Sequence, residues 1–426
     1  MKSKLFFLLL ISIGAFSIIS AQENNETIQV LIDRAVEVSP KIKMLESKKN
    51  AADARVEANS NLPDPMLTLG LMNLPTNSFS FTQEPMTGKM IGLSQAVPFP
   101  GKLSAAADVL NKDTEITQEE INDSRNEVIN NVRQTYYDLS FVREALKIAL
   151  KSKNNIERIE EVVRTKYTVS EASQQNLIQA AVELTKIKDK IVVLKGKEKA
   201  DLSTLNSYLL QNPDTPIETP SLSVIDSINF SIDELSKTAI QNRPFLKGIG
   251  LEKNKSELME SLADYEYYPN FNFSVQYSQR DKITSTNTPL NDFVSFVVGL
   301  NIPINYGGKK SARVQESKIM QQMYSDQYDA ALQVLNKNFG DGLSKLDELK
   351  EREKLNKEGL LPQAQQSLKS ALANYQVGKT DFINVLDAQN KVYETETNLY
   401  KIRLQYYKEL SRLEFLTGKT NLLENK

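Results

Sequence analysis

Hydrophobic and polar residues follow two different periods along this chain of 426 residues, and the period changes in the same order twice. In residues 271–278 and 294–302, apolar residues alternate with polar or small ones, as in a β-strand with one apolar face. Residues 67–72 and 91–97 show the same alternation. The pattern predicts four strands of about nine to eleven residues, the length of a tilted outer-membrane strand. Two hairpins packed on helices, outside any membrane, are the alternative.

Long helical segments follow each predicted pair of strands. Residues 381–417 contain no Pro and no Gly, and an apolar residue recurs there every seven positions, at Val385, Val392, Leu399, Tyr406 and Leu413. This period is typical of a coiled coil, here about 55 Å long at 1.5 Å per residue. Residues 177–194 have the same register in the first half of the chain. Ordinary helix-bundle packing would give the same pattern and stays open.

Residues 101–150 and 311–357 provide the partner helices of these two segments. Each half of the chain is therefore expected to form a helical hairpin, with its tip at Tyr167–Ser173 or Tyr375–Thr380. In the second half we expect local weak points and one break in the helix, because Gly and Pro disfavour helix interiors. The positions concerned are Gly340, Gly342, Gly359 and Pro362.

The chain is an internal duplication with an offset of about 204 to 208 residues. Tyr167-Thr168-Val169-Ser170 in the first half corresponds to Tyr375-Gln376-Val377-Gly378 in the second. A Pro-rich stretch from Asn212 to Pro220 separates the halves and is interpreted as a linker. The expected division is a signal peptide (1–21), a first repeat (22–211), a linker (212–232), a second repeat (233–420) and a C-terminal tail (421–426).

The N-terminal segment has the features of an export signal. Lys2 and Lys4 precede an apolar run, and Ser20-Ala21 forms a small-residue cleavage site before Gln22. We expect the mature chain to begin at Gln22, with an uncleaved membrane anchor as the alternative. After the signal, no apolar run approaches the roughly 18 residues that a membrane-spanning helix needs.

Composition excludes several classes of function. The chain contains no Cys and no His, which excludes Cys/His metal sites, thiol nucleophiles and imidazole acid–base catalysis. We therefore expect no enzyme and no cofactor. The 52 Lys and Arg residues do not exceed the 54 Asp and Glu residues, so nucleic acid is not an expected partner.

Four methionines lie around the first predicted pair of strands, at Met66, Met72, Met86 and Met90. Thioethers can bind Cu(I), but scattered methionines on strands are more often apolar filler or lipid-facing residues. No metal site is predicted, and transported ions would pass without a dedicated set of ligands.

Four amphipathic strands cannot close a barrel alone, and an open sheet in lipid would expose unpaired edge groups. The smallest membrane barrels have about eight strands, so a membrane location requires two or more chains to share one barrel. The residues expected to face lipid are Phe271, Phe273, Val275, Val294, Phe296 and Val298. Ser274, Gln276 and Ser295 are expected to face the lumen.

Three segments closely resemble TolC-like outer-membrane efflux proteins, and the resemblance spans about residues 27–418. The segments are Leu62-Pro63-Asp64-Pro65-Met66-Leu67, Leu93-Ser94-Gln95-Ala96-Val97-Pro98-Phe99-Pro100-Gly101-Lys102, and Tyr375-Gln376-Val377-Gly378-Lys379-Thr380-Asp381-Phe382 with Val385-Leu386-Asp387-Ala388. The first two are most similar to the heavy-metal efflux branch. The resemblance implies a mainly α fold with a small β part, in which three chains form a twelve-strand barrel and a helical tunnel.

The resemblance also implies partners and a location. Such a homotrimer lies in the outer-membrane lipid of a Gram-negative bacterium, with a large periplasmic part. It works with a periplasmic adaptor and an inner-membrane pump, expected to be of the RND type. It passively conducts metal ions or small toxic molecules to the exterior.

By the same resemblance, the periplasmic entrance is closed by Asp387, with Asn384 at a position that is acidic in some members. Three Asp387 carboxylates near one axis would attract cations. The residues expected to contact the adaptor lie at the two hairpin tips and are Val377, Gly378, Lys379, Asp381, Val169 and Ser170. The first tip has Ser170 at the position that corresponds to Gly378 of the second.

Three other functions remain open at this point. A type I secretion channel shares the architecture. An exported coiled-coil structural or adhesion protein would have its strands in a sheet outside the membrane. A periplasmic adaptor is the third, but adaptors commonly have one helical hairpin, whereas this sequence predicts two equivalent ones.

Overall fold

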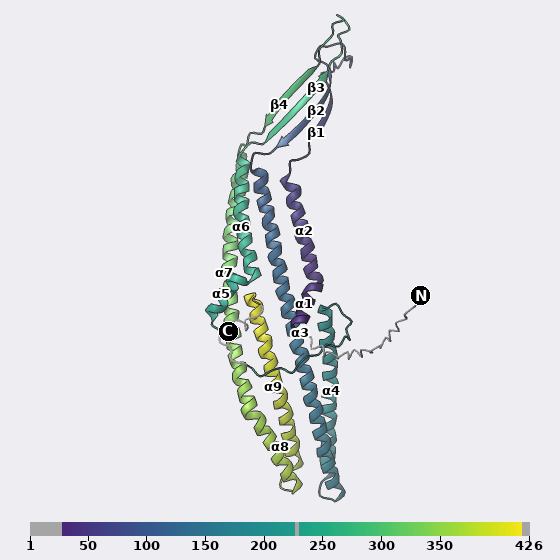
Figure 1. Cartoon of the computed structure of the whole chain (residues 1–426), viewed down its shortest axis with the longest axis vertical. Coiled ribbons are helices and arrows are strands. Elements are labelled where there is room, and N and C mark those ends of the chain that lie inside the picture. The colour runs from purple at the N-terminus through teal and green to yellow at the C-terminus, as the bar shows by residue number, and fades with distance from the viewer. Residues whose placement is uncertain (1–27, 226–229, 420–426) are drawn as a thin grey trace, which may run out of the picture.

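The computed structural model describes residues 28–225 and 230–419. The predicted signal peptide and C-terminal tail lie outside the described residues. The molecule is elongated, with a small β-sheet at one end and two helical hairpin tips at the other (Figure 1). It is mainly α with a small β part, which confirms the predicted fold class.

The two halves of the chain contain helices and strands in nearly the same order. The first half comprises α1 (Ile28–Val38), α2 (Pro40–Ser60), β1 (Met66–Met72), β2 (Gly88–Val97), α3 (Lys102–Thr168) and α4 (Gln174–Tyr208). The second comprises α5 (Ile232–Asn242), α6 (Pro244–Asp264), β3 (Phe271–Gln279), β4 (Phe293–Leu300), α7 (Lys309–Lys354), α8 (Leu361–Gln376) and α9 (Phe382–Thr417). Three short helices complete the described chain: η1 (Tyr265–Tyr267), η2 (Tyr306–Gly308) and the π-helix η3 (Leu355–Leu360).

The strands form one antiparallel sheet in the order β1-β2-β3-β4, so the pair β2-β3 joins the two halves. The inner strands have 10 and 9 residues, whereas β1 has 7 and β4 has 8, shorter than predicted. Both outer edges of the sheet are unpaired among residues 28–225 and 230–419.

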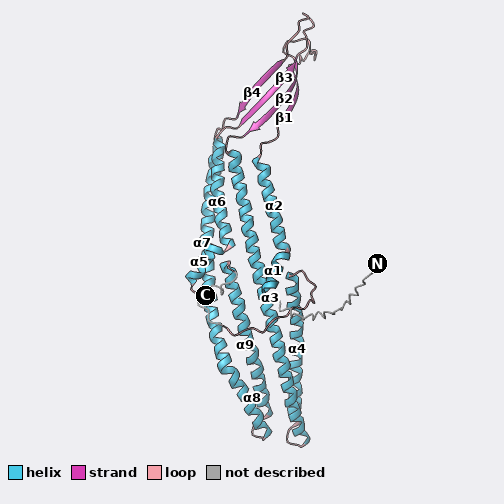
Figure 2. Ribbon diagram, in the orientation of Figure 1, coloured by secondary structure: helices cyan, strands magenta, loops and turns pink. Residues whose placement is uncertain are grey.

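The helices run side by side below the sheet (Figure 2). The 67-residue helix α3 extends roughly 100 Å at 1.5 Å per residue and packs against α2, α4, α6 and α9. No helix in the described ranges is long and apolar enough to cross a membrane.

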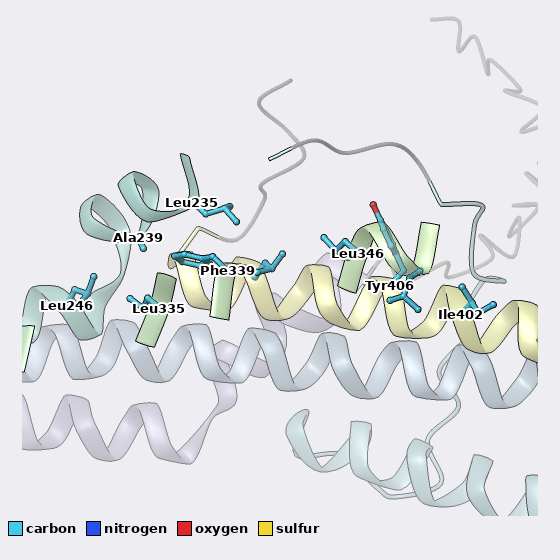
Figure 3. Close-up of a cluster of buried hydrophobic side chains, with 10 residues drawn as sticks. Leu235, Ala239, Leu246, Leu335, Phe339, Leu346, Ile402 and Tyr406 are labelled. Atoms are coloured by element: carbon cyan, nitrogen blue, oxygen red, sulfur yellow. The ribbon is translucent and has the colours of Figure 1, made fainter. Parts of the chain in front are cut away.

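The hydrophobic core is divided into clusters along the length of the helices. One cluster joins α5, α6, α7 and α9. Leu346 of α7 lies near Tyr406 of α9, and Phe339 of α7 lies further along, toward Leu335 (Figure 3). Every predicted heptad position of α9 is buried, which confirms the seven-residue register. Burial of each such large side chain stabilises the fold by about 1.5–3 kcal/mol.

The second long hairpin is regular at two of the four predicted positions and irregular around the other two. Helix α7 continues through Gly340 and Gly342, so these glycines do not interrupt the helix. The reason at Gly342 is close packing, because an added Cβ would lie 2.7 Å from Leu413 Cδ2. The irregularity near Pro362 is present as the π-helix η3, which contains Gly359. Such π-turns occur inside longer helices and often at functional positions.

A buried ion pair lies directly before this π-helix. Arg403 on α9 donates to Glu353 on α7 through Nη2 at 2.9 Å and Nε at 3.1 Å. Arg403 Nη1 also donates to the backbone oxygen of Leu222 at 3.2 Å, so one guanidinium joins both helices to the predicted linker. Ile217 and Leu222 of that linker are buried, and Arg143 of α3 donates to the Ile217 oxygen. At Ile217 and Leu222, the linker is therefore packed against the helices rather than extended into solvent.

Candidate functional site

One face of the sheet is a continuous apolar surface. Directly paired residues of an antiparallel sheet point to the same side, and the register pairs Phe273 with Val298 and Val275 with Phe296. The six residues predicted to face lipid therefore share one face. Leu93 pairs with Val275 and extends this face to β2 and β1. The apolar face comprises Leu67, Leu69, Leu71, Ile91, Leu93, Val97, Phe271, Phe273, Val275, Tyr277, Val294, Phe296, Val298 and Leu300.

This apolar face is exposed in the single chain, with Phe296 78% and Leu69 72% exposed. Its two polar residues on β2, Lys89 and Gln95, lie near opposite ends of that strand. Lys89 forms an ion pair with Asp281 beyond the sheet, at 3.1 Å. An apolar band bounded by polar ends is what lipid contact requires.

The opposite face of the sheet is mostly polar or small. Ser274, Gln276 and Ser295 lie on it, as predicted for the lumen side. Thr68, Ser94 and four glycines share it, and Phe293 and Val297 are its large apolar exceptions on β4. The sheet therefore has one face suited to lipid and one suited to water.

Aromatic residues gather where the sheet meets the helices, a feature that the sequence analysis did not identify. Phe99 stacks on Tyr268 with ring centroids 4.6 Å apart, and Tyr265 lies beside both. Tyr306, at the same junction, is 90% exposed. Aromatic girdles flank the apolar band of membrane barrels, because their rings combine apolar and polar parts. The sequence signal was the Tyr-rich run 265–268 before the third strand.

The two hairpin tips at the other end of the molecule have the same backbone conformation. Val169 and Val377 have φ of −99° in both turns, and their side chains are exposed. Ser170 and Gly378 follow in the left-handed region, at φ of 61° and 71°. Matching hydrogen bonds close the turns, from Ser170 N–H to Tyr167 C=O (3.0 Å) and from Gly378 N–H to Tyr375 C=O (3.1 Å). Serine in place of glycine at position 170 therefore leaves the first turn with the same conformation as the second.

The two tips are packed against each other. A buried cluster contains Val163 of α3, Ala180 of α4 and Phe382 of α9, and it includes Tyr375 of α8. A groove of about 390 Å³ lies beside this cluster and is lined by residues from both hairpins, including Lys166, Glu171, Tyr375, Thr380, Asp381 and Ile383. The buried Tyr375 hydroxyl has no hydrogen-bond partner among the described residues. The groove thus offers polar and apolar groups from both tips to one partner.

Asp387 and Asn384 lie on the exposed side of α9. They are three residues apart and so lie on the same side of the helix, whereas Val385 and Leu386 between them are buried. Asn384 Nδ2 donates to Thr380 Oγ1 at 3.0 Å. The position of Asp387 beside the heptad seam agrees with the prediction, while its role at an entrance stays a prediction.

Charge is also buried midway along the helices, outside the sheet and tips. Arg243 at the start of α6 contacts Asp123 of α3, with Nη2 and Oδ1 3.1 Å apart. Burial raises the pKa of Asp123 above its ordinary value, although the Arg243 charge opposes this. Burial likewise lowers the pKa of Arg243. This pair joins α3 to α6 and has a structural role.

Acidic metal sites are not found in the part of the chain that the structure describes, where no group of three or more Asp and Glu residues is placed to hold a metal ion. The candidate functional surfaces are therefore the sheet, the tips and the exposed side of α9.

Comparison with known families gives one family model that matches residues 31–209 and 235–419, described as outer membrane efflux protein. The chain is 22% identical to a probable outer membrane lipoprotein, SilC, of Salmonella typhimurium, over 79% of this chain and 72% of the relative. It is 21% identical to the cobalt-zinc-cadmium resistance protein CzcC of Cupriavidus metallidurans, over 75% and 74%. It is 20% identical to the outer membrane protein TolC of Vibrio cholerae, over 92% and 91%.

Solved structures show the same fold at low sequence identity. The outer-membrane channel OprN superposes with a TM-score of 0.77 at 13% identity, covering 92% of this chain and 90% of that one. CusC, described as forming a transmembrane channel, superposes with a TM-score of 0.75 at 18% identity, covering 92% of each chain. The fold of a helical tunnel joined to a barrel is therefore shared along most of the chain.

Proposed function

Since this chain belongs to the outer membrane efflux protein family, whose members are channels and not enzymes, we propose that it is the outer-membrane channel of a tripartite efflux system. It passively conducts substrates that an inner-membrane pump and a periplasmic adaptor deliver. The family also confirms that the chain is not an enzyme, as predicted from the missing Cys and His.

The observation that supports this proposal most strongly is the open sheet. It has an exposed apolar face, a mostly polar opposite face and two unpaired edges. In lipid each unpaired backbone group costs several kcal/mol, so β1 of one chain must pair with β4 of another. Three copies would give twelve strands, an even number within the range of known barrels.

The hairpin tips support the second part of the proposal. They lie at the end of the molecule farthest from the sheet, which is the periplasmic end if the sheet lies in the outer membrane (Figure 1). Val377, Gly378, Lys379 and Asp381 at the second tip would contact the adaptor. Because the first turn has the same conformation, Val169 and Ser170 would offer the adaptor an equivalent surface.

The entrance would be controlled by α9. In a threefold assembly, the exposed side of α9 brings three Asp387 carboxylates and three Asn384 amides near one axis. Three carboxylates of like charge close to one axis attract cations. The resemblance to the heavy-metal branch supports an RND-type pump and a metal substrate, and the name of the relative CzcC also supports a metal substrate.

Fractionation and efflux assays test the proposal together. The mature chain should begin at Gln22 and be recovered from the outer-membrane fraction as a detergent-stable trimer. A deletion strain should become sensitive to copper, silver, zinc, cobalt or members of a drug panel, and the plasmid-borne gene should restore tolerance. A monomer in the periplasm would instead support a coiled-coil structural or adhesion protein. Loss of protein export without any change in tolerance would support a type I secretion channel.

A further inference from the structure

The methionines of the first strand pair are not explained by lipid contact. The register places Met72 opposite Gly88 and Met90 opposite Gly70, whereas the apolar face contains the residues between them. Met66, Met72 and Met90 therefore lie on the mostly polar face of the sheet. That face would line the pore in the proposed channel, and this step rests on the proposed function.

Met72 and Met90 are close neighbours on that face. Met90 Cε lies 3.2 Å from the position that a Cβ on Gly70 would occupy, so the Met90 side chain lies across β1. Met72 follows Gly70 by two residues and points to the same side. Long side chains at such diagonal positions reach one another. The absence of a side chain at Gly70 leaves the space that Met90 uses.

A third methionine lies at the same end of the strand pair. Asn73 directly follows Met72, and its Nδ2 donates to the backbone oxygen of Met86 at 3.0 Å. Thr87 Oγ1 donates in return to the Asn73 oxygen at 2.8 Å. These two bonds hold the Met86 backbone beside the end of β1, and the Met86 side chain is exposed.

The chemistry of these side chains selects a class of cation. Thioethers are soft ligands that favour Cu(I) and Ag(I), whereas Zn²⁺ prefers His, Cys and carboxylates. The whole chain contains no Cys and no His, so no stronger soft ligand competes with the thioethers. We propose that Met72 and Met90, with Met86, form a weak binding site for a soft monovalent cation, Cu(I) or Ag(I), at the outer end of the pore. Weak binding suits a channel, because a transported ion must also leave.

Silver titration of the full-length mature protein tests this site. Silver nitrate is titrated by calorimetry into detergent-purified protein in chloride-free buffer. We expect wild-type protein to bind Ag⁺ and the double variant Met72→Leu/Met90→Leu to bind it at least tenfold more weakly, because Leu has a similar volume but no sulfur. The control Met320→Leu/Met323→Leu on α7 should bind Ag⁺ like the wild type. Zinc nitrate should give no binding that depends on Met72 and Met90.

Equal silver affinity in the wild type and the Met72/Met90 variant would overturn the site. The trimer size and conductance of the same preparations separate this result from a failure of the proposed channel. Both methionines belong to one chain, so silver binding does not require the trimer. If the trimer conducts but silver affinity is unchanged in the variant, the site is refuted and the channel stands. If silver binding depends on the two methionines but no trimer forms, the site stands and the channel is refuted.

Discussion

Replacement of Glu353 by Ala should destabilise the helical part of the protein strongly. Glu353 and Arg403 have side chains only 7% and 9% exposed, and the guanidinium also binds the Leu222 oxygen. Truncation of Glu353 leaves the Arg403 charge buried without its carboxylate. Loss of one partner from a buried pair costs about 3–5 kcal/mol, mostly because the remaining charge is uncompensated. The same change releases the start of the π-helix from α9.

Two matched variants separate this effect from a general loss of charge. Glu348→Ala removes an ion pair with Arg352 on the same helix, at 2.9 Å, but both side chains are more than 40% exposed. Solvent screens that pair, so the variant should unfold like the wild type. Glu353→Leu/Arg403→Leu removes both buried charges and should recover most of the lost stability.

Chemical denaturation of the detergent-solubilised trimer, followed by circular dichroism of the helices, measures all three variants. Glu353→Ala should unfold at a clearly lower denaturant concentration than both the wild type and Glu348→Ala. If Glu353→Ala and Glu348→Ala unfold together, the buried pair does not hold α7, α9 and the linker, and the reasoning is wrong.

Three further predictions concern the barrel, the entrance and the helix packing. Phe296→Arg should destabilise the membrane-inserted trimer by about 2–4 kcal/mol, whereas Ser295→Arg, on the other face, should be tolerated, as measured by urea unfolding from vesicles. Asp387→Ala should weaken cation selectivity and divalent block in single-channel recordings of an intact trimer. Gly342→Ala should lower the stability of the protein by about 1–3 kcal/mol, because the added methyl group overpacks the contact between α7 and α9. Gly359→Ala should not destabilise the protein, because no atom lies within 4 Å of the added Cβ. Thermal denaturation measures both variants.

Each of these predictions has a result that contradicts it. If Phe296→Arg and Ser295→Arg destabilise the trimer equally, the two faces of the sheet do not face lipid and water. An unchanged current in Asp387→Ala would make that residue an ordinary solvated Asp. Equal thermal stability of Gly342→Ala and Gly359→Ala would show that α7 and α9 do not approach as closely as described. Asp381→Ala, nearer the tip, is the control for Asp387, since it should weaken adaptor binding and leave the current unchanged.

Periodicity along the chain was sufficient to predict most of the fold. Apolar and polar residues alternate around Phe273 and Phe296, and this alternation predicted that both side chains share one face of the sheet. The strand register confirms that they do. The heptad from Val385 to Leu413 likewise predicted the buried side of α9. These patterns are local consequences of strand and helix geometry, so a single sequence reveals them.

Contacts between distant segments could not be predicted in this way. Arg403 and Glu353 are 50 residues apart, and nothing in either neighbourhood indicates the other. Position 170 is a serine rather than the glycine that favours a left-handed turn, yet it has the same conformation as Gly378, and a matching hydrogen bond to Tyr167 closes the turn. The face of Met90 also depends on the strand register, which composition alone does not give.

Planar-bilayer recording of the mature protein, extracted from outer membranes as a purified trimer, shows whether this chain forms a channel. We expect stepwise, cation-selective conductance increments from each inserted trimer. The variant Phe296→Arg, with fewer inserted trimers, should give fewer steps of the same size. A preparation that contains intact wild-type trimers but produces no stepwise conductance would contradict the claim that this chain forms a channel.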